Sequence, residues 1–310
     1  MGELRFAIAT FKRVFDVTPS RDVLSLEELA RGLTRFAVRP KLQARVDREL
    51  ARLERAWRAL LDGEARGGRH ASVLRRAYAR AGRAGAEQAY EKMRRRAKAR
   101  SKTELRIWSP TLYPPGARRG ADHVVHLSCV VLDYDEGASI DEASDRWSEV
   151  FHIVHSTWSY TPERPRFRLV LPLAHPVPAE HWEPVWSWAS ARAGGCNDPA
   201  LKSPASTYAL PATPSVRTPR RAFVVERPLL DPLAIGLVPR VAPPPAAVPS
   251  PAPVSQFRGD PDLQFVDAGE ADVALADFEL FGGDDEDPLE EEFDLFGADN
   301  EDSLDEFDLF

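Results

Sequence analysis

Two aspartates at the end of an apolar run are the residues of this sequence best suited to chemistry. Apolar residues fill the stretch from Cys129 to Leu132, and Asp133 and Asp135 follow with Tyr134 between them. Such a run predicts a buried strand, and side chains alternate along a strand, so both carboxylates lie on one face. Hard cations prefer carboxylate oxygens, and phosphoryl transfer uses such cations to neutralise charge. The spacing predicts a Mg²⁺ or Mn²⁺ site; the alternative is a pair of solvated aspartates.

Arginines further along the chain could bind the anionic part of a substrate. In the stretch 166–173, Arg166 and Arg168 alternate with apolar residues and share one face of a predicted strand. The planar guanidinium matches phosphate oxygens. A third acid, Asp198, follows, although Asn-Asp-Pro is also ordinary turn chemistry. Together these groups predict clamps for metal and phosphate in nucleotidyl transfer, and the alternative for the arginines is an exposed strand face paired with acids.

The elements that must position these residues alternate between strand and helix. In the first hundred residues the pattern predicts a strand over 4–10 and helices over 25–39, 42–60 and 72–100. Around the candidate site it predicts strands over 127–135, 151–157 and 166–173, a helix over 139–150 and another over 179–193 that ends at Gly194-Gly195. The fold class predicted from this order is α/β of the α+β type, a mixed sheet with flanking helices.

The segment from about 107 to 211 resembles the archaeo-eukaryotic primase superfamily, especially the primase-polymerases of plasmids and phages. Val131-Leu-Asp133-Tyr-Asp135 looks like the first motif of that superfamily, and Asn197-Asp198 looks like the third. His155-Ser156-Thr157, with Arg166 and Arg168 across a hairpin, looks like the second. The histidine precedes the serine here, whereas the family has a small residue before its histidine.

The resemblance implies a primase-polymerase-like fold and a role for each motif. Three acids would be catalytic and would bind two divalent metal ions, Mg²⁺ or Mn²⁺: Asp133, Asp135 and Asp198. Four residues would bind the triphosphate of the incoming nucleotide: His155, Ser156, Arg166 and Arg168.

Charge is distributed unevenly along the chain. Residues 260–310 hold 21 of the 48 acidic residues and no Lys or Arg, so the preceding 259 residues carry a net charge of +14. A body that basic favours a polyanionic partner, and a single-stranded DNA template suits the primase resemblance; the alternative is a protein with many solvated arginines. The expected backbone contacts come from the end of a helix and a following loop: Lys92, Arg94, Arg95, Arg96, Arg118 and Arg119.

The acidic tail contains three near-identical repeats, at 277–282, 292–297 and 306–310. A Pro/Ala-rich linker over 236–259 precedes the tail, whose composition over 260–310 is too acidic for folding alone. The repeats resemble sliding-clamp-binding motifs and predict a partner with an apolar pocket, the clamp or another replication protein. The alternative is a tail that folds back on the basic body and competes with DNA. The partner-binding residues would be Phe278, Leu280, Phe281, Phe293, Leu295, Phe296, Phe307, Leu309 and Phe310.

These features predict four segments: a strand and basic helical region over 1–105, a catalytic domain over 106–235, the linker and the tail. The sequence has two cysteines, and it lacks the apolar stretch of about 18 residues that a membrane helix needs, so we expect a cytoplasmic protein without a membrane partner. The predicted function is a DNA replication primase or polymerase of a mobile element. The alternatives are an inactive nucleic-acid-binding adaptor and a two-metal nuclease. If Arg166 and Arg168 face the same cleft as Asp133 and Asp135, the enzyme is favoured.

Overall fold

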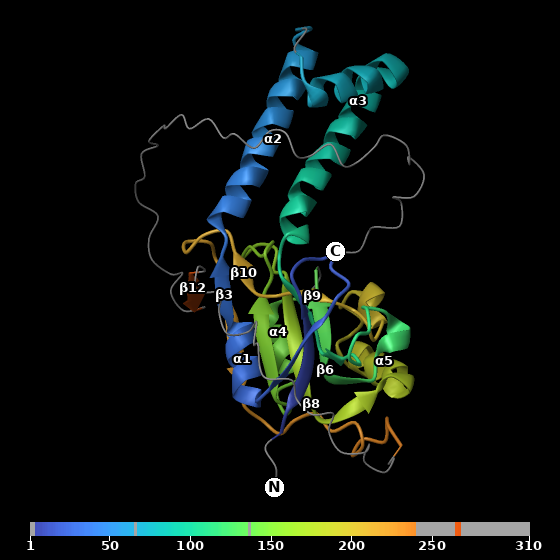
Figure 1. Cartoon of the computed structure of the whole chain (residues 1–310). Helices are drawn as coiled ribbons and strands as arrows, with labels where there is room; N and C mark the ends of the chain where they lie inside the picture. Colours follow the sequence, from blue (N-terminus) through green and yellow to red (C-terminus); the bar gives the residue numbers. More distant parts are fainter. Residues whose placement is uncertain (1–3, 65–66, 136–137, 240–263, 268–310) are drawn as a thin grey trace. The chain divides into compact units, whose positions relative to one another are not determined.

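The computed structural model describes residues 4–64, 67–135, 138–239 and 264–267 (Figure 1). The chain divides into two units, residues 1–271 and 272–310, and all described residues belong to the first. The described strands form sheets of five, four and three strands, and helices accompany them. The predicted mixed α+β class is confirmed.

The five-stranded sheet has the order β11-β7-β8-β6-β5, and its neighbouring strands are all antiparallel. Its strands are β5 (Thr111–Leu112), β6 (His126–Tyr134), β7 (His152–Ser156), β8 (Phe167–Pro178) and β11 (Ala222–Val225). Alternation along β6 sends Val130 and Leu132 to one face and Cys129 and Val131 to the other, and all four are buried. Both faces of this sheet are therefore covered, which explains why β6 reads as a continuous apolar run.

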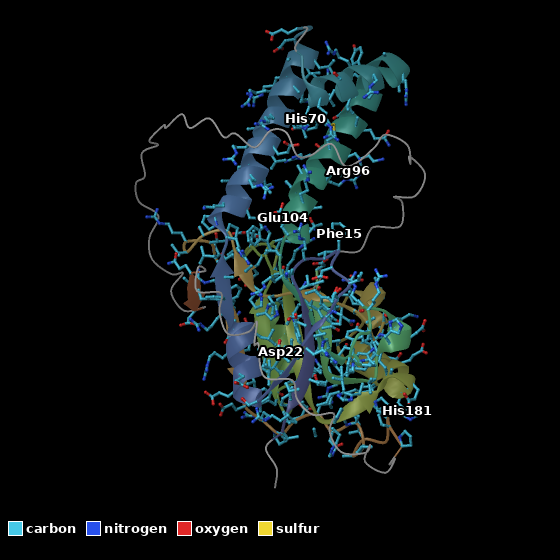
Figure 2. The ribbon with its side chains drawn as sticks, viewed as in Figure 1. Phe15, Asp22, His70, Arg96, Glu104 and His181 are labelled. Carbon is cyan, nitrogen blue, oxygen red and sulfur yellow. The ribbon has the colours of Figure 1, made fainter. Side chains whose placement is uncertain are left out.

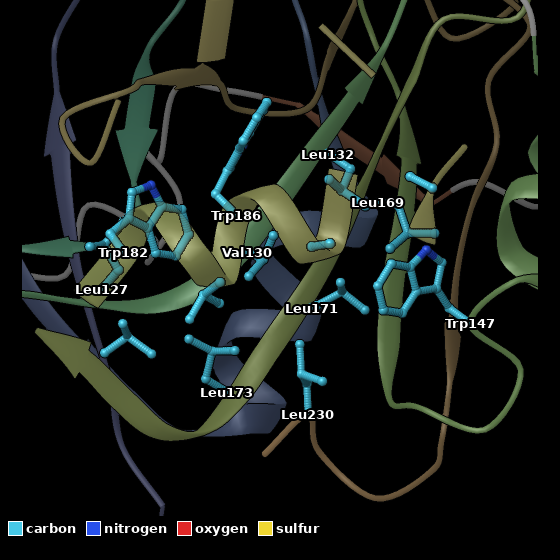
Figure 3. Packing of buried hydrophobic residues seen from close by; sticks show 14 of the residues in the cluster. Leu127, Val130, Leu132, Trp147, Leu169, Leu171, Leu173, Trp182, Trp186 and Leu230 are labelled. Atoms are coloured by element: carbon cyan, nitrogen blue, oxygen red, sulfur yellow. The ribbon is translucent and has the colours of Figure 1, made fainter. Parts of the chain in front are cut away.

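Helices α4 (Ile140–Asp145) and α5 (Trp182–Arg192) cover the first face. Figure 3 shows the resulting core, in which Trp147 and Trp186 pack with leucines of the sheet. Each such large side chain contributes about 1.5–3 kcal/mol when fully buried. Helix α4 ends at Asp145 and not near residue 150 as predicted, because turns follow it before β7. Helix α5 agrees with the prediction, and Gly194 and Gly195 follow it with positive φ.

The second face of the sheet packs against a four-stranded sheet of order β2-β1-β4-β9 and against helix α1. These elements are β1 (Phe6–Phe11), β2 (Ser20–Leu24), β4 (Ile107–Ser109), β9 (Tyr208–Ala209) and α1 (Leu26–Thr34). Helix α1 begins with a capping box, since the Ser25 side chain accepts from the Glu28 backbone N–H and the Glu28 carboxylate accepts from the Ser25 N–H. From α1, Leu29 and Leu33 join the same core as Val131 of β6.

The third sheet has the order β10-β3-β12, and it corrects two predictions. Its strands are β3 (Arg35–Val38), β10 (Ala212–Thr213) and β12 (Phe265–Asp267). The helix expected over 25–39 ends at Thr34, because the next four residues pair with β10 and β12. Within the predicted tail, residues 265–267 form a paired strand, β12, whereas residues 240–263 and 268–310 lie outside the described residues. Strands of the predicted segments 1–105 and 106–235 share sheets within one unit.

Helices α2 (Pro40–Leu61) and α3 (Arg69–Thr103) agree with the predicted helical pair and lie side by side (Figure 1). Trp57 stacks on Tyr90 with 5.0 Å between ring centroids, and the Tyr90 hydroxyl donates to Glu54 at 2.6 Å. Helix α3 bends at Gly82, whose φ of 63° is open to glycine but strained for other residues. None of the described helices has the length and apolar composition needed to cross a bilayer.

A buried carboxylate lies in the four-stranded sheet. Asp22 of β2 pairs with Ile8 of β1, and among the described residues its Oδ2 has no hydrogen-bond partner (Figure 2). Burial raises the pKa of Asp22 from 3.8 to about 6, and the charge of Arg106 opposes that rise. The folded state therefore holds the Asp22 proton more tightly than the unfolded state, so the contribution of Asp22 to stability is greatest below about pH 4 and is lost as the pH rises through about 6.

We predict that Asp22→Asn stabilises the protein at neutral pH. The amide carries no charge, so the substitution should raise the free energy of unfolding by roughly 2–3 kcal/mol at pH 7 and leave it nearly unchanged at pH 3.5. Urea unfolding at both pH values measures this. Asp145→Asn is the control, because Asp145 is exposed and its substitution should change neither value. An equal effect of Asp22→Asn at both pH values would contradict the assigned shift.

Candidate active site

Three of the predicted site residues form one row across the five-stranded sheet. Asp133 of β6 lies opposite Arg168 of β8, and Arg168 lies opposite His155 of β7. Residues that face each other in antiparallel pairs share a face of the sheet, so all three side chains are on the side covered by the four-stranded sheet. The alternation inferred from the sequence thus brings together side chains from three strands, of which β6 and β8 are paired although β7 lies between them in the sequence.

Asp133 and Arg168 form a buried ion pair. The Arg168 Nε donates to Asp133 Oδ2 at 3.0 Å, and the Arg168 Nη2 also lies 3.0 Å from that oxygen. The side chains are only 11% and 8% exposed. Burial raises the pKa of Asp133 and the Arg168 charge opposes that rise, while the second oxygen, Oδ1, has no hydrogen-bond partner among the described residues. One carboxylate oxygen is therefore held in place, and the other keeps its lone pairs for a ligand.

A second ion pair, more exposed to solvent, lies beside the first. Arg166 Nη1 is 3.7 Å from Asp135 Oδ1, and these side chains are 17% and 34% exposed. Ion pairs in contact with water contribute little to stability, so this pair can separate at small cost when a ligand arrives. We call Asp133, Asp135, Arg166 and Arg168 the carboxylate–arginine cluster.

His155 and Ser156 do not act together. His155 is fully buried, and burial, with the charge of Arg168, lowers the pKa of His155 to about 3. The neutral ring carries its hydrogen on Nδ1, since that atom lies 3.2 Å from the Ser156 carbonyl oxygen, which can only accept. Nε2 is then an acceptor and has no partner among the described residues. Ser156 faces the other side, opposite Phe167, and its hydroxyl accepts from the Arg221 backbone N–H.

Asp198 lies close to the cluster through its backbone. Its N–H donates to the Asp133 carbonyl oxygen at 2.9 Å, while its carboxylate accepts from the Ala200 N–H at 2.9 Å and caps the short helix η3 (Pro199–Lys202). The negative charge of Asp198 also contributes to the raised pKa of Asp133. Asp198 thus combines the turn role that Asn-Asp-Pro favours with a position next to the site.

The donors present fit a cation that takes only part of its shell from protein. In the described part of the chain, no group of three or more His, Cys, Asp or Glu side chains is arranged to bind a metal ion. Two carboxylates, one with a free buried oxygen, match the way Mg²⁺ commonly binds, through one or two acids with water and substrate phosphate completing the shell. Asp133 and Asp135 are the residues that would hold Mg²⁺ or Mn²⁺.

Two residues not assigned from the sequence also belong to the site. Lys102, near the end of α3, has its pKa lowered by burial and then by the charge of Arg166, while Asp135 opposes that shift. Tyr208 of β9 lies under the Arg168 guanidinium, 5.7 Å from ring centroid to Cζ, and burial raises the pKa of Tyr208. Lys102 ends the basic run of the sequence, but only tertiary structure brings it to the cluster.

The residues predicted to contact nucleic acid are mostly exposed. Four of them lie on the second half of α3 and are exposed: Lys92, Arg94, Arg95 and Arg96. Figure 2 labels Arg96. Arg118 is exposed too, whereas Arg119 donates to the Val14 carbonyl oxygen and covers the Phe11 ring. The partner-binding residues from Phe278 to Phe310 lie outside the described residues.

Part of the chain, including the strands of the cluster and most of α3, matches a known protein family. Residues 72–194 match the VapE N-terminal domain. That segment runs from α3 through β8 to the end of α5, so it contains the carboxylate–arginine cluster. The match supports the primase-polymerase-like resemblance read from the motifs.

A solved structure gives a weaker likeness. The archaeo-eukaryotic primase domain of the cyanophage S-2L primase-polymerase is 15% identical, with a TM-score of 0.32, over 44% of this chain and 70% of that one. A likeness at this level carries no weight for activity. The search of curated proteins finds no match.

We predict different coupling energies for the two ion pairs. In a double-mutant cycle, Asp133→Asn with Arg168→Met should give a coupling of about 2 kcal/mol or more, because Arg168→Met alone leaves a buried charge unpaired. Asp135→Asn with Arg166→Met should give less than about 1 kcal/mol. Urea unfolding at pH 7 measures both. Equal couplings would show that burial does not distinguish the pairs.

Proposed function

We propose that this protein is a metal-dependent nucleotidyltransferase of the primase-polymerase type that extends a primer or starts a chain on a single-stranded DNA template. The observation that carries the proposal is the row formed by Asp133, Arg168 and His155, with Asp135 and Arg166 beside it. Acids and arginines face one another at one end of the central strands of the sheet, which is the arrangement that favours an enzyme over an adaptor.

Each residue of the cluster has a task that its chemistry supports. Asp133, through Oδ1, and Asp135 would hold Mg²⁺ or Mn²⁺, which when bound would neutralise phosphate charge and orient the reacting oxygens. Arg166 and Lys102 are cations at the edge of the site and would bind the triphosphate of the incoming nucleotide. Arg168 holds the Asp133 carboxylate in place through a hydrogen bond, and the contact of its guanidinium with the Tyr208 ring holds Arg168 itself.

His155 fits a different part of the nucleotide from the one implied by the family motif. With its hydrogen on Nδ1, the ring offers only the Nε2 lone pair, which accepts from a hydroxyl and repels a phosphate oxygen. A sugar hydroxyl is the donor that a nucleotide supplies next to its phosphates. We assign His155 to orienting the sugar, which requires that nucleotide binding expose the buried Nε2 atom, and we assign the phosphates to the cations.

One observation favours an inactive nucleic-acid-binding adaptor as the second candidate. Arg168 already neutralises Asp133, so a metal ion must bind beside a guanidinium. For an enzyme, the nucleotide phosphates must draw the arginines of the cluster away from the aspartates so that a metal ion can bind. An adaptor needs no such rearrangement. A two-metal nuclease would use the same acids, and its products would distinguish it.

We predict that nucleotide incorporation depends on the two acids of the cluster. On a primed or bare single-stranded template with Mg²⁺ or Mn²⁺, Asp133→Ala with Asp135→Ala should lower incorporation by at least about 100-fold, because the metal loses its protein ligands. Glu180→Ala is the control, since Glu180 is exposed on the segment before α5. Lys102→Ala and Arg166→Ala should raise KM for the nucleotide more than they lower kcat.

The outcomes separate the three functions. Template binding without incorporation by the wild type, with both metals and both nucleotide types, would favour the adaptor. Shortening of the template that is lost in the double variant would favour the nuclease. Incorporation that survives in the double variant would overturn the assignment of the metal ligands.

We further propose that the acidic tail recruits the sliding clamp through its repeats at 277–282, 292–297 and 306–310. Each repeat offers a leucine and phenylalanines to an apolar pocket and acids to a basic rim, and three linked copies raise avidity through effective concentration. Recruitment of this kind suits a replication protein that must return repeatedly to the same assembly.

We predict that clamp binding depends on the number of intact repeats. Replacing Leu280, Leu295 and Leu309 together by alanine should abolish binding, while one replacement should weaken it only severalfold, since the other copies remain. Surface plasmon resonance on immobilised clamp measures this. Val273→Ala with Leu275→Ala, in the tail but outside the repeats, is the control. Equal losses in the triple variant and the control would exclude the repeats as the binding element.

A further inference from the structure

The loop between β1 and β2, residues 12–19, holds the most exposed of the large apolar side chains in the described part of the chain. Phe15 is 69% exposed. Burying such a ring would stabilise the protein by about 1.5–3 kcal/mol, so its exposure leaves an apolar surface that a ligand can cover. A single exposed apolar residue is common on proteins, and the argument for a site rests on how this loop is held and on what surrounds it.

The loop is fixed by its own acid. Asp16 accepts from the Lys12 N–H at 3.2 Å through Oδ2 and from the Thr18 N–H at 3.0 Å through Oδ1. The Asp16 N–H in turn donates to the Arg13 carbonyl oxygen at 3.0 Å. Both oxygens of the one acid in the loop are therefore engaged by backbone, and Phe15, at the turn, is presented to solvent by a preorganised loop.

Contacts to two neighbouring segments fix the loop further. The Val14 N–H donates to the Thr103 carbonyl oxygen at the end of α3, at 3.4 Å. Arg119 donates to the Val14 carbonyl oxygen through Nη1 at 2.9 Å and to the Val17 carbonyl oxygen through its backbone N–H at 2.8 Å. Figure 2 shows Phe15 near the end of α3, where Glu104 is also labelled.

Basic residues lie on the same loop as Phe15 and on the segment that contacts this loop. Lys12 and Arg13 are exposed on the loop itself, and Arg118 is exposed on the segment that Arg119 ties to it. Among the residues that the structure describes, none forms an ion pair with Lys12, Arg13 or Arg118. An exposed aromatic ring on a loop with exposed basic residues matches a single-stranded nucleic acid, whose bases stack on aromatic rings while its phosphates contact basic groups.

The position of the loop relates it to the proposed site. Thr103, which accepts from Val14, follows Lys102, and Lys102 interacts electrostatically with Arg166 and Asp135 of the carboxylate–arginine cluster. We propose that Phe15 is a stacking platform for one base of the single-stranded template beside the active site, and that Lys12, Arg13 and Arg118 bind the adjoining phosphates. The template role rests on the proposed function, whereas single-strand binding by the loop does not.

A single-stranded oligonucleotide tests the platform without requiring catalysis. Fluorescence anisotropy with the full-length protein should show binding weakened about 5- to 150-fold by Phe15→Ala, since stacking of one base is worth about 1–3 kcal/mol. Phe15→Trp should keep wild-type affinity. Phe15→Leu should behave as Phe15→Ala does, because leucine keeps the apolar character but has no π-face for a base to stack on.

Salt dependence distinguishes the ring from the cations. Phe15→Ala should leave the slope of log K against log salt unchanged, whereas Arg13→Gln and Arg118→Gln should each reduce it by about 0.7, the value expected for one phosphate contact on a single strand.

Three results would overturn the platform. Affinity of Phe15→Ala within twofold of the wild type would exclude a role for the ring. If Phe15→Leu kept full affinity, the contact would be a general apolar one, of the kind a protein partner makes, and base stacking would be excluded. A loss with Phe15→Ala on duplex DNA equal to that on single strands would exclude base stacking, since bases in a duplex are already stacked. Because binding is measured without incorporation, failure of the platform and failure of the nucleotidyltransferase proposal are separate outcomes.

Discussion

The ion pair between Asp133 and Arg168 is the interaction on which the arrangement of the site depends. Its partners come from adjacent antiparallel strands, β6 and β8, and a shift of one residue in their register would send one of the two side chains to the opposite face. Both charges are buried, so each is tolerated only while the other is there. The apolar packing on both faces of the sheet fixes the strand register, and this register determines which site residues lie opposite one another. The neighbouring pair, Arg166 with Asp135, is more exposed and has more freedom to exchange its partner for a ligand.

Local patterns were sufficient for the strands that carry the site. The apolar run to Leu132 predicted the buried strand β6, which ends at Tyr134, one residue before Asp135. The alternation of Arg166 and Arg168 predicted β8, which begins at Phe167, one residue after Arg166. These inferences need only the two-residue period of a strand. The same period places His155 and Ser156 on opposite faces of the strand, although the sequence motif groups the two residues together. Capping chemistry at Ser25 and Ser139 was also readable, because both partners lie within one helical turn.

What the sequence did not predict depends on contacts between distant segments. Strand β3 has a sequence that continues a helix well, yet pairing with β10 and β12, more than 170 residues further on, makes it a strand. Strand β2 is short and contains polar residues such as Asp22, so its sequence alone does not indicate a strand. It becomes a strand by pairing with β1. Lys102 and Tyr208 reach the cluster from α3 and β9, and no spacing in the sequence relates them to Asp133.

The pairing of β3 has a consequence for the order in which the chain folds during synthesis. Helices α2 and α3 are neighbours in sequence, so their contacts close only short loops and can form early. Strand β3 immediately precedes them but obtains β10 only after residue 213 and β12 only after residue 267 have been made. The strand edge that β3 presents thus stays open through most of translation, and unpaired edges of this kind are the sites where nascent chains associate wrongly. Completion of the third sheet is therefore a late step: both edges of β3 lack their partners until residue 213 has been made, and one edge lacks its partner until residue 267 has been made.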